Sequence, residues 1–284
     1  MLRILGYTLG FFAICGLVAV GAMVWVFWTY GQDLPDYTQL NDYAPPITTR
    51  VHAGDGSLLA EYAVQKRVFV PIETVPTVVK QAFLAAEDQN FYVHPGVDPV
   101  GILRAVVTNV RNIGSGRRPE GASTITQQVA QNFLLTKDVS IERKIREAIL
   151  AFRIERAFTK DQILELYLNE IYLGYGAYGV ATASLNYFGK PMSQLTPDEA
   201  AFLAALPKAP NNYNPVTNQD AAVARRNYVL GRMAEDGAIS AEAAEELKQK
   251  PIDVVPDTLA ARIEAPYFAE EVRRELAELV GDTG

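Results

Sequence analysis

An uncharged apolar segment at the N-terminus limits most strongly how this chain can fold. Residues 4–28 contain no charged side chain. A helix of this length rises roughly 37 Å at ~1.5 Å per residue, enough to cross the hydrocarbon core of a bilayer. Trp25, Trp28 and Tyr30 gather at one end, where aromatic rings favour the headgroup region. We therefore expect a transmembrane anchor within residues 1–30.

The charges beside this segment predict its orientation. Arg3 precedes it, and Asp33 and Asp36 follow it. Under the positive-inside rule the N-terminus stays in the cytoplasm and the remainder is exported. A cleaved signal peptide is the alternative, with a weak small-residue site at residues 19–22. Its apolar region would be much too long, so a single-pass anchor is favoured.

Composition excludes several classes of protein. The 284 residues carry a formal net charge of −7, which argues against a general nucleic-acid binder, since such a protein shows a basic face. An anionic ligand must then be held by local groups of Lys and Arg. His52 and His94 are too few for a His-rich zinc site. Cys15 lies in the apolar segment, so the rest of the chain can form no disulfide.

Proline, glycine and hydrophobic spacing divide the chain further. Residues 31–50 form a polar linker, residues 51–250 a domain, and residues 251–284 a proline-punctuated connector towards a domain that this sequence does not contain. Residues 51–62 carry a hairpin signal around Ala-Gly-Asp-Gly. Residues 114–119 read as a mobile loop. Thr159 and Thr196 are start signals for helices. Helices are expected at 77–87, 99–112, 123–134, 140–158, 161–170, 178–187, 197–206, 218–236, 241–249 and 266–280. The fold class is therefore mainly α with a small β entry.

The first polar segment interrupts an apolar helix at residues 87–98. Glu87 and Asp88 end that helix, and Phe91, His94 and Asp98 follow. Acids at a helix C-terminus oppose the macrodipole, and this tends to raise a carboxylate pKa. The alternative is an ordinary polar helix end in which Asp98 caps the next helix.

The second and third segments are also polar. In residues 121–132, Ser123 or Thr124 is a good N-cap, and the amides that follow suit sugar or phosphate oxygens. The alternative is the polar face of a surface helix. Residues 143–147 read Arg-Lys-Ile-Arg-Glu on an amphipathic helix. Ordinary salt bridges between Glu147 and Arg143 or Lys144 would explain this segment as well.

Taken together and in this order, the segments resemble the family-51 peptidoglycan glycosyltransferases, found in class A penicillin-binding proteins and monofunctional relatives. The first matches the family pattern E-D-x-x-F-x-x-H-x-G-x-D, the second G-x-S-T-I-T-Q-Q and the third R-K-x-x-E. Residues 163–169 and 187–190 also look like the family. The likeness covers residues 50–250, roughly the whole predicted domain.

The resemblance implies a lysozyme-like, two-lobed helical fold and an inverting transfer of a growing glycan from its polyprenyl pyrophosphate onto lipid II. Glu87 corresponds to the general base, and Glu147 to a second acid that orients Lys144, Arg146 or the donor. Asp88 would support Glu87 or a metal. The resemblance implies substrate binding by Asp88, Phe91, His94, Ser123, Thr124, Gln127, Gln128, Asn132, Arg143, Lys144 and Arg146.

Its other implications concern ligands and location. The partners are lipid II, the growing glycan-polyprenyl pyrophosphate and the bilayer, with cell-wall synthesis proteins as further candidates and no nucleic acid. The location is the bacterial inner membrane, with the domain periplasmic. No tightly bound cofactor is expected. A divalent cation, Mg or Mn, is expected with the pyrophosphate, and it needs no separate protein cage.

The sequence departs from the family at two positions. Gln131 and Val139 stand where members usually carry cations that grip phosphate. We expect Gln131→Lys to raise turnover or lower KM in a polymerisation assay. The S-x-x-K and K-T-G motifs of a transpeptidase do not occur, so covalent penicillin binding is not expected.

Alternatives to the transferase remain at this point. A lysozyme-like hydrolase would need a raised-pKa acid near a saccharide groove, but neither the basic helix nor an anchor. A catalytically weak membrane scaffold would fit the two departures. The apolar stretch from Val100 to Ile113, with Arg104 and Arg111, suits either a helix in the membrane interface or a buried core helix.

Overall fold

The computed structural model describes residues 2–32, 34–40, 49–52, 58–62, 66–112, 121–135 and 140–255. Two compact units divide the chain. Unit 1 combines Met1–Asp42 with Val93–Thr159, and unit 2 combines Tyr43–Tyr92 with Lys160–Gly284. Each unit is therefore built from two separate stretches of chain. Most of the described residues are helical.

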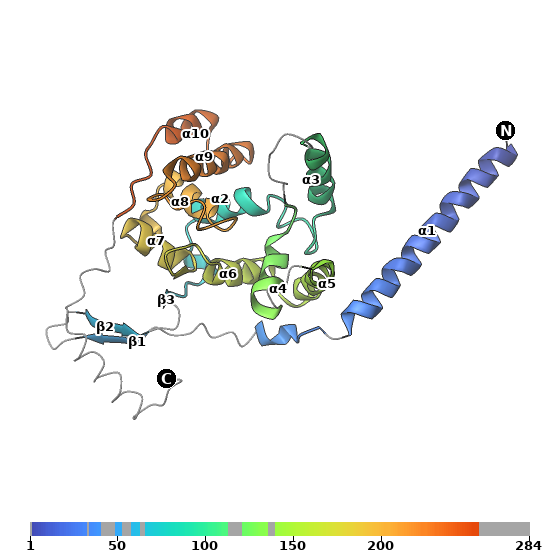
Figure 1. Ribbon diagram of the computed structural model, residues 1–284, viewed down its shortest axis with the longest axis horizontal. Helices are drawn as coiled ribbons and strands as arrows, with labels where there is room; N and C mark the ends of the chain where they lie inside the picture. The colour runs from blue at the N-terminus through green and yellow to red at the C-terminus, as the bar shows by residue number, and fades with distance from the viewer. Residues whose placement is uncertain are drawn as a thin grey trace, which may run out of the picture. The chain divides into compact units, whose positions relative to one another are not determined.

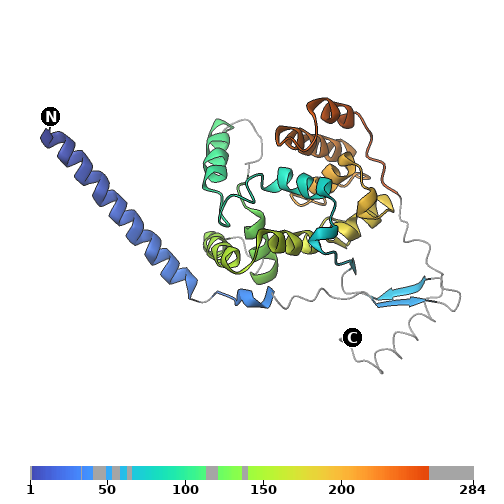
Figure 2. The ribbon, with the colours of Figure 1, turned by 180° about the vertical axis from the view of Figure 1, so that it is seen from behind.

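The regular elements in the described part of unit 1 are all helices. Its elements are α1 (Leu2–Gly31), η1 (Tyr37–Leu40), α3 (Pro99–Arg111), α4 (Ile125–Leu134) and α5 (Ile141–Ala157). Both views show α4 beside α5 (Figures 1 and 2). The end of α1 also contacts α5, where the ring centroids of Phe27 and Phe152 are 6.3 Å apart. Arg153 Nη2 donates to the carbonyl oxygen of Gly31 at 2.7 Å and fixes this contact.

Capping side chains determine where these helices begin. Asp98 Oδ1 accepts from the Val100 amide at 3.0 Å, with proline at the first helical position of α3. Thr124 and Gln127 form a reciprocal capping box at the start of α4. Ser140 Oγ accepts from the Arg143 amide at 3.0 Å at the start of α5. Each cap satisfies an amide that has no partner inside its helix, so the local sequence alone determines these starts.

Unit 2 has a helical core and two small strand pairs. Its elements are β1 (Thr49–His52), β2 (Leu58–Tyr62), β3 (Lys66–Arg67), η2 (Ile72–Thr74), α2 (Thr77–Glu87), α6 (Lys160–Glu170), β4 (Ala177–Tyr178), α7 (Val180–Phe188), η3 (Met192–Gln194), α8 (Pro197–Ala205), α9 (Gln219–Glu235) and α10 (Ala241–Lys248). β1 and β2 pair antiparallel, with Thr49 opposite Tyr62. β3 and β4 pair parallel.

The core of unit 2 forms around α8. This helix packs against α2 and α9, and the three lie together in both ribbon views (Figures 1 and 2). Its alanines at 200, 201, 204 and 205 are fully buried, and small side chains allow the neighbouring helices to approach closely. Phe83 of α2 and Phe202 of α8 fill the remaining space. The C-terminal end of α2 is thereby fixed by a well-packed core.

Helix α3 in unit 1 has very little buried surface. Val100, Leu103 and Val110 are each more than 60% exposed, and Ala105 is its buried residue among those described. The interpretation of this stretch as a buried core helix is therefore wrong. A contiguous apolar face of this kind marks a binding or membrane surface. The other interpretation, that this helix lies in the membrane interface, stays a prediction.

Helix α1 has the length and composition of a membrane span. The candidate span is Leu9–Gly31, with 23 residues, and its side chains are exposed rather than packed into a core. An apolar helix with this much exposed surface is not the core helix of a folded domain. The predicted N-terminal apolar helix is confirmed, whereas its orientation stays a prediction.

The mainly helical fold class and the hairpin are confirmed, and the observed helices lie within a few residues of their expected bounds. Helix α7 begins at Val180 rather than at 178, because Gly179 has a φ of +77° and Tyr178 belongs to β4. The β3–β4 pair was missed because two-residue strands show no periodicity. The expected helix at 266–280 and the loop at 114–119 lie outside the described residues.

Candidate active site

The first candidate group lies where α2 ends in unit 2. The helix runs to Glu87, and the Asp88 amide still donates to the carbonyl of Leu84 at 2.8 Å. The chain then turns, so that the Phe91 amide donates to the Asp88 carbonyl and the Phe91 ring is fully buried. Lys160 Nζ lies 4.5 Å from the centroid of that ring. Phe91 thus anchors the turn that places the two acids.

The Glu87 side chain is 13% exposed and faces a cation on another helix. Arg225 of α9 places Nη2 3.9 Å from Glu87 Oε1. The hydroxyl of Tyr167, on α6, is also nearby. Burial raises the pKa of Tyr167 well above its ordinary value, and the negative charges of Glu87 and Asp88 raise it further. Both acids therefore act electrostatically on one buried tyrosine.

Unit 1 contains the rest of the first segment. His94 is buried, and its Nδ1 accepts from the Gly96 amide at 3.1 Å. Gly96 has a φ of +97°, and a Cβ atom there would lie 2.8 Å from the Ala151 carbonyl oxygen. The loop therefore packs directly on the backbone of α5. The substrate-binding role expected for His94 stays a prediction, and here its imidazole shapes a turn.

The second segment joins this loop to α4. Thr124 Oγ1 donates to the Gly96 carbonyl at 2.6 Å, and the Thr124 amide donates to Gln127 Oε1 at 3.0 Å. Thr124 and Gln127 are buried, Gln128 is partly exposed and Asn132 is exposed. The N-cap prediction for Thr124 is confirmed. Because Thr124 and Gln127 have these partners, Ser123, Gln128 and Asn132 are the more accessible polar groups of the segment.

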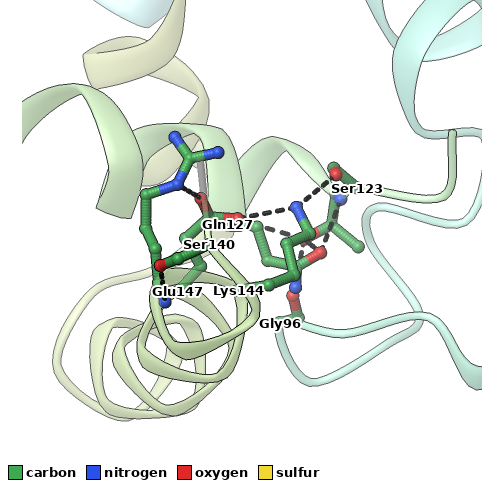
Figure 3. Close-up of polar contacts among 8 residues, drawn as sticks. Gly96, Ser123, Gln127, Ser140, Lys144 and Glu147 are labelled. Atoms are coloured by element: carbon green, nitrogen blue, oxygen red, sulfur yellow. Dashed lines mark hydrogen bonds and ion pairs between the residues drawn. The ribbon is translucent and has the colours of Figure 1, made fainter. Parts of the chain in front are cut away.

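The third segment carries a buried acid with two cations (Figure 3). Glu147 is completely buried, Lys144 Nζ lies 2.6 Å from its Oε2, and Arg143 Nε lies 3.4 Å from its Oε1. Lys144 Nζ also donates to Ser123 Oγ at 2.6 Å. The salt-bridge interpretation of Glu147 is thus confirmed. These contacts also join α5 to the N-terminus of α4, where anions are favoured.

Arg146 pairs with a different acid of α5. Its Nη2 lies 2.7 Å from Glu142 Oε1, and the Glu142 side chain is 53% exposed. The two cations within ion-pair distance of Glu147 are Arg143 and Lys144. The suggestion that Glu147 orients Arg146 is therefore not supported by these contacts, whereas the suggestion for Lys144 is.

The fourth and fifth segments have structural contacts. The Asn169 side chain accepts from the Val70 amide and donates to the Val70 carbonyl, both at 2.9 Å. Glu165 Oε2 accepts from the Ile72 amide at 2.7 Å. Tyr187 donates to the Leu173 carbonyl at 2.7 Å. These contacts hold the segment after β3 and the loop after α6 in place, so the sequence pattern here reflects the fold of unit 2.

Two residues near Glu87 were missed from the sequence. Tyr167 lies within the fourth segment, but no pattern there indicated proximity to Glu87. Arg225 lies far along the chain beside another arginine and belongs to none of the motifs. Glu87 belongs to unit 2 and Glu147 to unit 1, so the joint action expected of the two acids stays a prediction.

In the part of the chain that the structure describes, no group of three His, Cys, Asp or Glu side chains could hold a metal ion. Mg²⁺ needs only one or two carboxylates when substrate phosphates supply other ligands. Glu87 and Asp88 could contribute these, so the divalent cation stays a prediction.

Comparison with known proteins identifies the family. The transglycosylase family model matches residues 55–234, which is more than half of the sequence. The chain belongs to the transglycosylase family.

Its relatives carry a more particular name. Penicillin-binding protein 1A of Rickettsia bellii is 51% identical over 281 residues, covering 99% of this chain and 36% of the relative. Penicillin-binding protein 1A of Escherichia coli is 43% identical, over 95% of this chain and 31% of the relative. The crystal structure of penicillin-binding protein 1A from Haemophilus influenzae has a TM-score of 0.49 at 28% identity, over 84% of this chain and 25% of that one. The chain thus spans about a third of the length of its curated relatives.

Proposed function

We propose that this chain polymerises glycan strands from lipid II by inverting transfer from a polyprenyl pyrophosphate. The observation that carries the proposal is the arrangement of Lys144. Its ammonium contacts the fully buried Glu147, while the Lys144 side chain stays 49% exposed. A buried acid therefore holds a cation at the surface. Such a fixed cation suits a departing diphosphate, whereas a hydrolase that expels a sugar alcohol needs an acid in that place.

The chemistry assigned to the residues is one displacement. Glu87 accepts the proton of an acceptor sugar hydroxyl as that oxygen forms a bond to the donor anomeric carbon. The bond from this carbon to the pyrophosphate oxygen breaks, and its electron pair leaves with the diphosphate. A positioned base contributes about 10²–10⁴-fold. Arg143 and Lys144 would stabilise the charge on the leaving group.

Glu147 has a supporting role in this proposal. With its side chain fully buried and its Oε2 already 2.6 Å from Lys144, it is poorly placed to reach a substrate proton. Its charge instead fixes the direction of two cations on successive residues of α5. Ser123 Oγ accepts a hydrogen bond from the same Lys144 ammonium, and Ser123 would contact the same phosphate or sugar oxygens. A divalent cation bound with the diphosphate would add charge neutralisation.

The proposed location is the outer face of the inner membrane. The 23-residue span within α1 would anchor the chain with Arg3 in the cytoplasm, and the apolar face of α3 would lie in the outer interface. Both features suit a substrate whose polyprenyl tail stays in the bilayer. The finer partners, the growing glycan-polyprenyl pyrophosphate and other cell-wall synthesis proteins, belong to the same proposal.

The test is lipid II turnover by the full chain in detergent, with Glu87→Gln as the variant and Glu235→Gln as the matched control. Glu235 is an exposed acid of unit 2 that pairs with Arg232. We expect polymer from the wild type and the control, and a loss of at least about 10²-fold for Glu87→Gln. Cleavage of added cell-wall glycan, without polymer from lipid II, would indicate a hydrolase. Neither product would indicate a scaffold, and an active Glu87→Gln would refute the assigned base.

A further inference from the structure

Helix α5 receives the end of the apolar helix α1. Arg153 of α5 donates from Nη2 to the carbonyl oxygen of Gly31 at 2.7 Å, and Gly31 is the buried last residue of α1. One turn earlier in α1, the ring centroid of Phe27 lies 6.3 Å from that of Phe152. Beyond α1, η1 also contacts α5, and its Leu40 is 5% exposed. The end of α1 is thus joined to α5 by several contacts.

The carbonyl of Gly31 belongs to a helix end that favours a cation. The last four carbonyls of a helix have no amide partner within it, and this end carries a partial negative charge. An unpaired carbonyl is costly near a bilayer, where water is scarce. Arg153 supplies both a donor and a positive charge. Glycine permits the close approach, because a Cβ atom at position 31 would lie 3.4 Å from Arg153 Nη2.

Arg153 differs from the basic residues near the start of α5. Those residues pair with acids of their own helix, Lys144 with Glu147 and Arg146 with Glu142. Among the described residues, the hydrogen-bond partner of the Arg153 guanidinium is a backbone carbonyl of α1 rather than an acid. A salt bridge within α5 therefore does not explain Arg153, and its contact joins two helices.

Helix α5 connects this contact to the Lys144 cation. Lys144 and Arg153 are nine residues apart in one unbroken helix, Ile141–Ala157. This separation is roughly 13 Å along the axis and about two and a half turns. Lys144 therefore projects from the side of α5 roughly opposite Arg153, where its ammonium donates to Ser123 Oγ. The contact with α1 leaves the ammonium accessible and fixes the helix that carries it.

We propose that Arg153 is a positioning residue for the transfer, because its contact with Gly31 sets the height of the Lys144 ammonium above the bilayer. The inference rests on the proposed function, in which Lys144 stabilises the departing diphosphate. A substrate with its polyprenyl tail in the bilayer carries its diphosphate at the level of the headgroups. A cation on a helix that is fixed to the membrane span stays at one level, and misplacement by ~1 Å can cost about 10²-fold in rate. Arg153 itself does not touch the substrate.

The first test compares two substrates with the full chain in liposomes. One is lipid II with a polyprenyl tail in the same bilayer, and the other is a water-soluble lipid II with a short tail. Arg153→Met should lower kcat/KM about tenfold for the polyprenyl substrate and at most about twofold for the soluble one, which can follow the cation to a new height. Arg153→Lys should retain most of the activity, because it can still donate to the carbonyl. Arg156→Met, at an exposed arginine of the same helix, should change neither value.

The second test measures the contact directly, as the distance between two spin labels by pulsed electron spin resonance. The labels are at Thr29→Cys in α1 and Ile141→Cys at the start of α5, both exposed, in a Cys15→Ser background. The otherwise unchanged chain should give one narrow distance distribution, and Arg153→Met a broad one. Phe27→Ala removes the ring contact without changing α5 and should broaden the distribution in part. This variant keeps the inference testable if Arg153→Met does not fold.

Two outcomes would overturn the inference. Equal losses of kcat/KM for the two substrates would make Arg153 an ordinary structural residue. An unchanged narrow distribution in Arg153→Met would show that other contacts hold α1 on α5. Failure of the proposed function is distinguishable from both, because the wild type would then make no polymer from either substrate while the spin labels still reported on the contact between Arg153 and Gly31.

Discussion

The ammonium group of Lys144 lies 2.6 Å from Oε2 of Glu147, an acid with no exposed side-chain surface. The same nitrogen donates to Ser123 Oγ at 2.6 Å, so one lysine links α5 to the start of α4. A buried carboxylate that loses a partner keeps a desolvated charge, and this is costly. Lys144 therefore stabilises unit 1 as well as presenting a cation.

Lys144→Met should lower the free energy of unfolding by about 2 kcal/mol, below the usual range for a broken buried pair because Lys144 is half exposed. Arg146→Met is the matched control on the same helix. Its partner Glu142 is 53% exposed, so we expect a loss under about 1 kcal/mol. Denaturant unfolding of both variants in detergent checks this. Equal losses of unfolding free energy in the two variants would show that the burial of Glu147 does not strengthen its pairing with Lys144.

Gly96→Ala should destabilise unit 1 by about 3 kcal/mol, because the new Cβ would meet the Ala151 carbonyl oxygen at 2.8 Å and the φ is +97°. Gly237→Ala is the control that has the positive φ without the steric clash. Gly237 has a φ of +73°, but nothing lies within 4 Å of the position that a Cβ would occupy there, so about 1 kcal/mol is expected. The difference in unfolding free energy between the variants measures the clash. A similar loss for both would mean that the loop moves off α5 without cost.

Tyr187→Phe and Tyr167→Phe should have different effects. Tyr187 donates to the Leu173 carbonyl at 2.7 Å, so its loss leaves that buried acceptor short of a partner and should cost about 1–2 kcal/mol. The Tyr167 hydroxyl is buried with no hydrogen-bond partner among the described residues. Tyr167→Phe should be neutral or slightly stabilising at neutral pH. A large loss for Tyr167→Phe would reveal a partner for that hydroxyl.

Alkaline pH should destabilise the folded chain partly through the same tyrosines. Burial raises the pKa of both Tyr167 and Tyr187, so the folded state holds these protons above the ordinary tyrosine value of about 10. Their contribution is complete below that pH and is lost as the pH rises towards the folded pKa. Tyr167→Phe should therefore reduce the fall in melting temperature between about pH 9 and pH 11. An unchanged fall would contradict this.

The apolar face of α3 should enter the interface of a bilayer. A spin label at Leu103→Cys, in a Cys15→Ser background in liposomes, should be shielded from a water-soluble quencher and accessible to oxygen. Leu103 is 65% exposed in the fold, and Val216→Cys, 70% exposed on unit 2, is the control that should stay in water. Equal access of the aqueous quencher to both labels would exclude the interface interpretation.

Local features of the sequence predicted most of the secondary structure. Thr124 and Gln127 are three residues apart and cap their own helix, and Thr196 does the same with Glu199. Such interactions depend only on nearby residues, so spacing suffices to find them. The β3–β4 pair could not be found in this way, because its stability comes from a partner strand distant in sequence.

The candidate site was predictable in part. The pairing of Glu147 with Arg143 and Lys144 follows from helical spacing alone. The complete burial of Glu147 and the bond from Lys144 to Ser123 do not, because they depend on how α4 and α5 pack. The sequence also left open whether α3 is exposed or buried in a core. An apolar pattern shows which side chains avoid water, but it does not show what covers them.

The sequence by itself determined the apolar N-terminal helix, the helical character of the domain and the family to which it belongs, because periodicity, caps and motifs act over a few residues. Only the tertiary structure decided that Arg225 lies beside Glu87 and that Asn169 holds the segment after β3 at Val70. These contacts join residues far apart in the chain. Packing around α8 and α6 brings them together, and no local pattern encodes that packing.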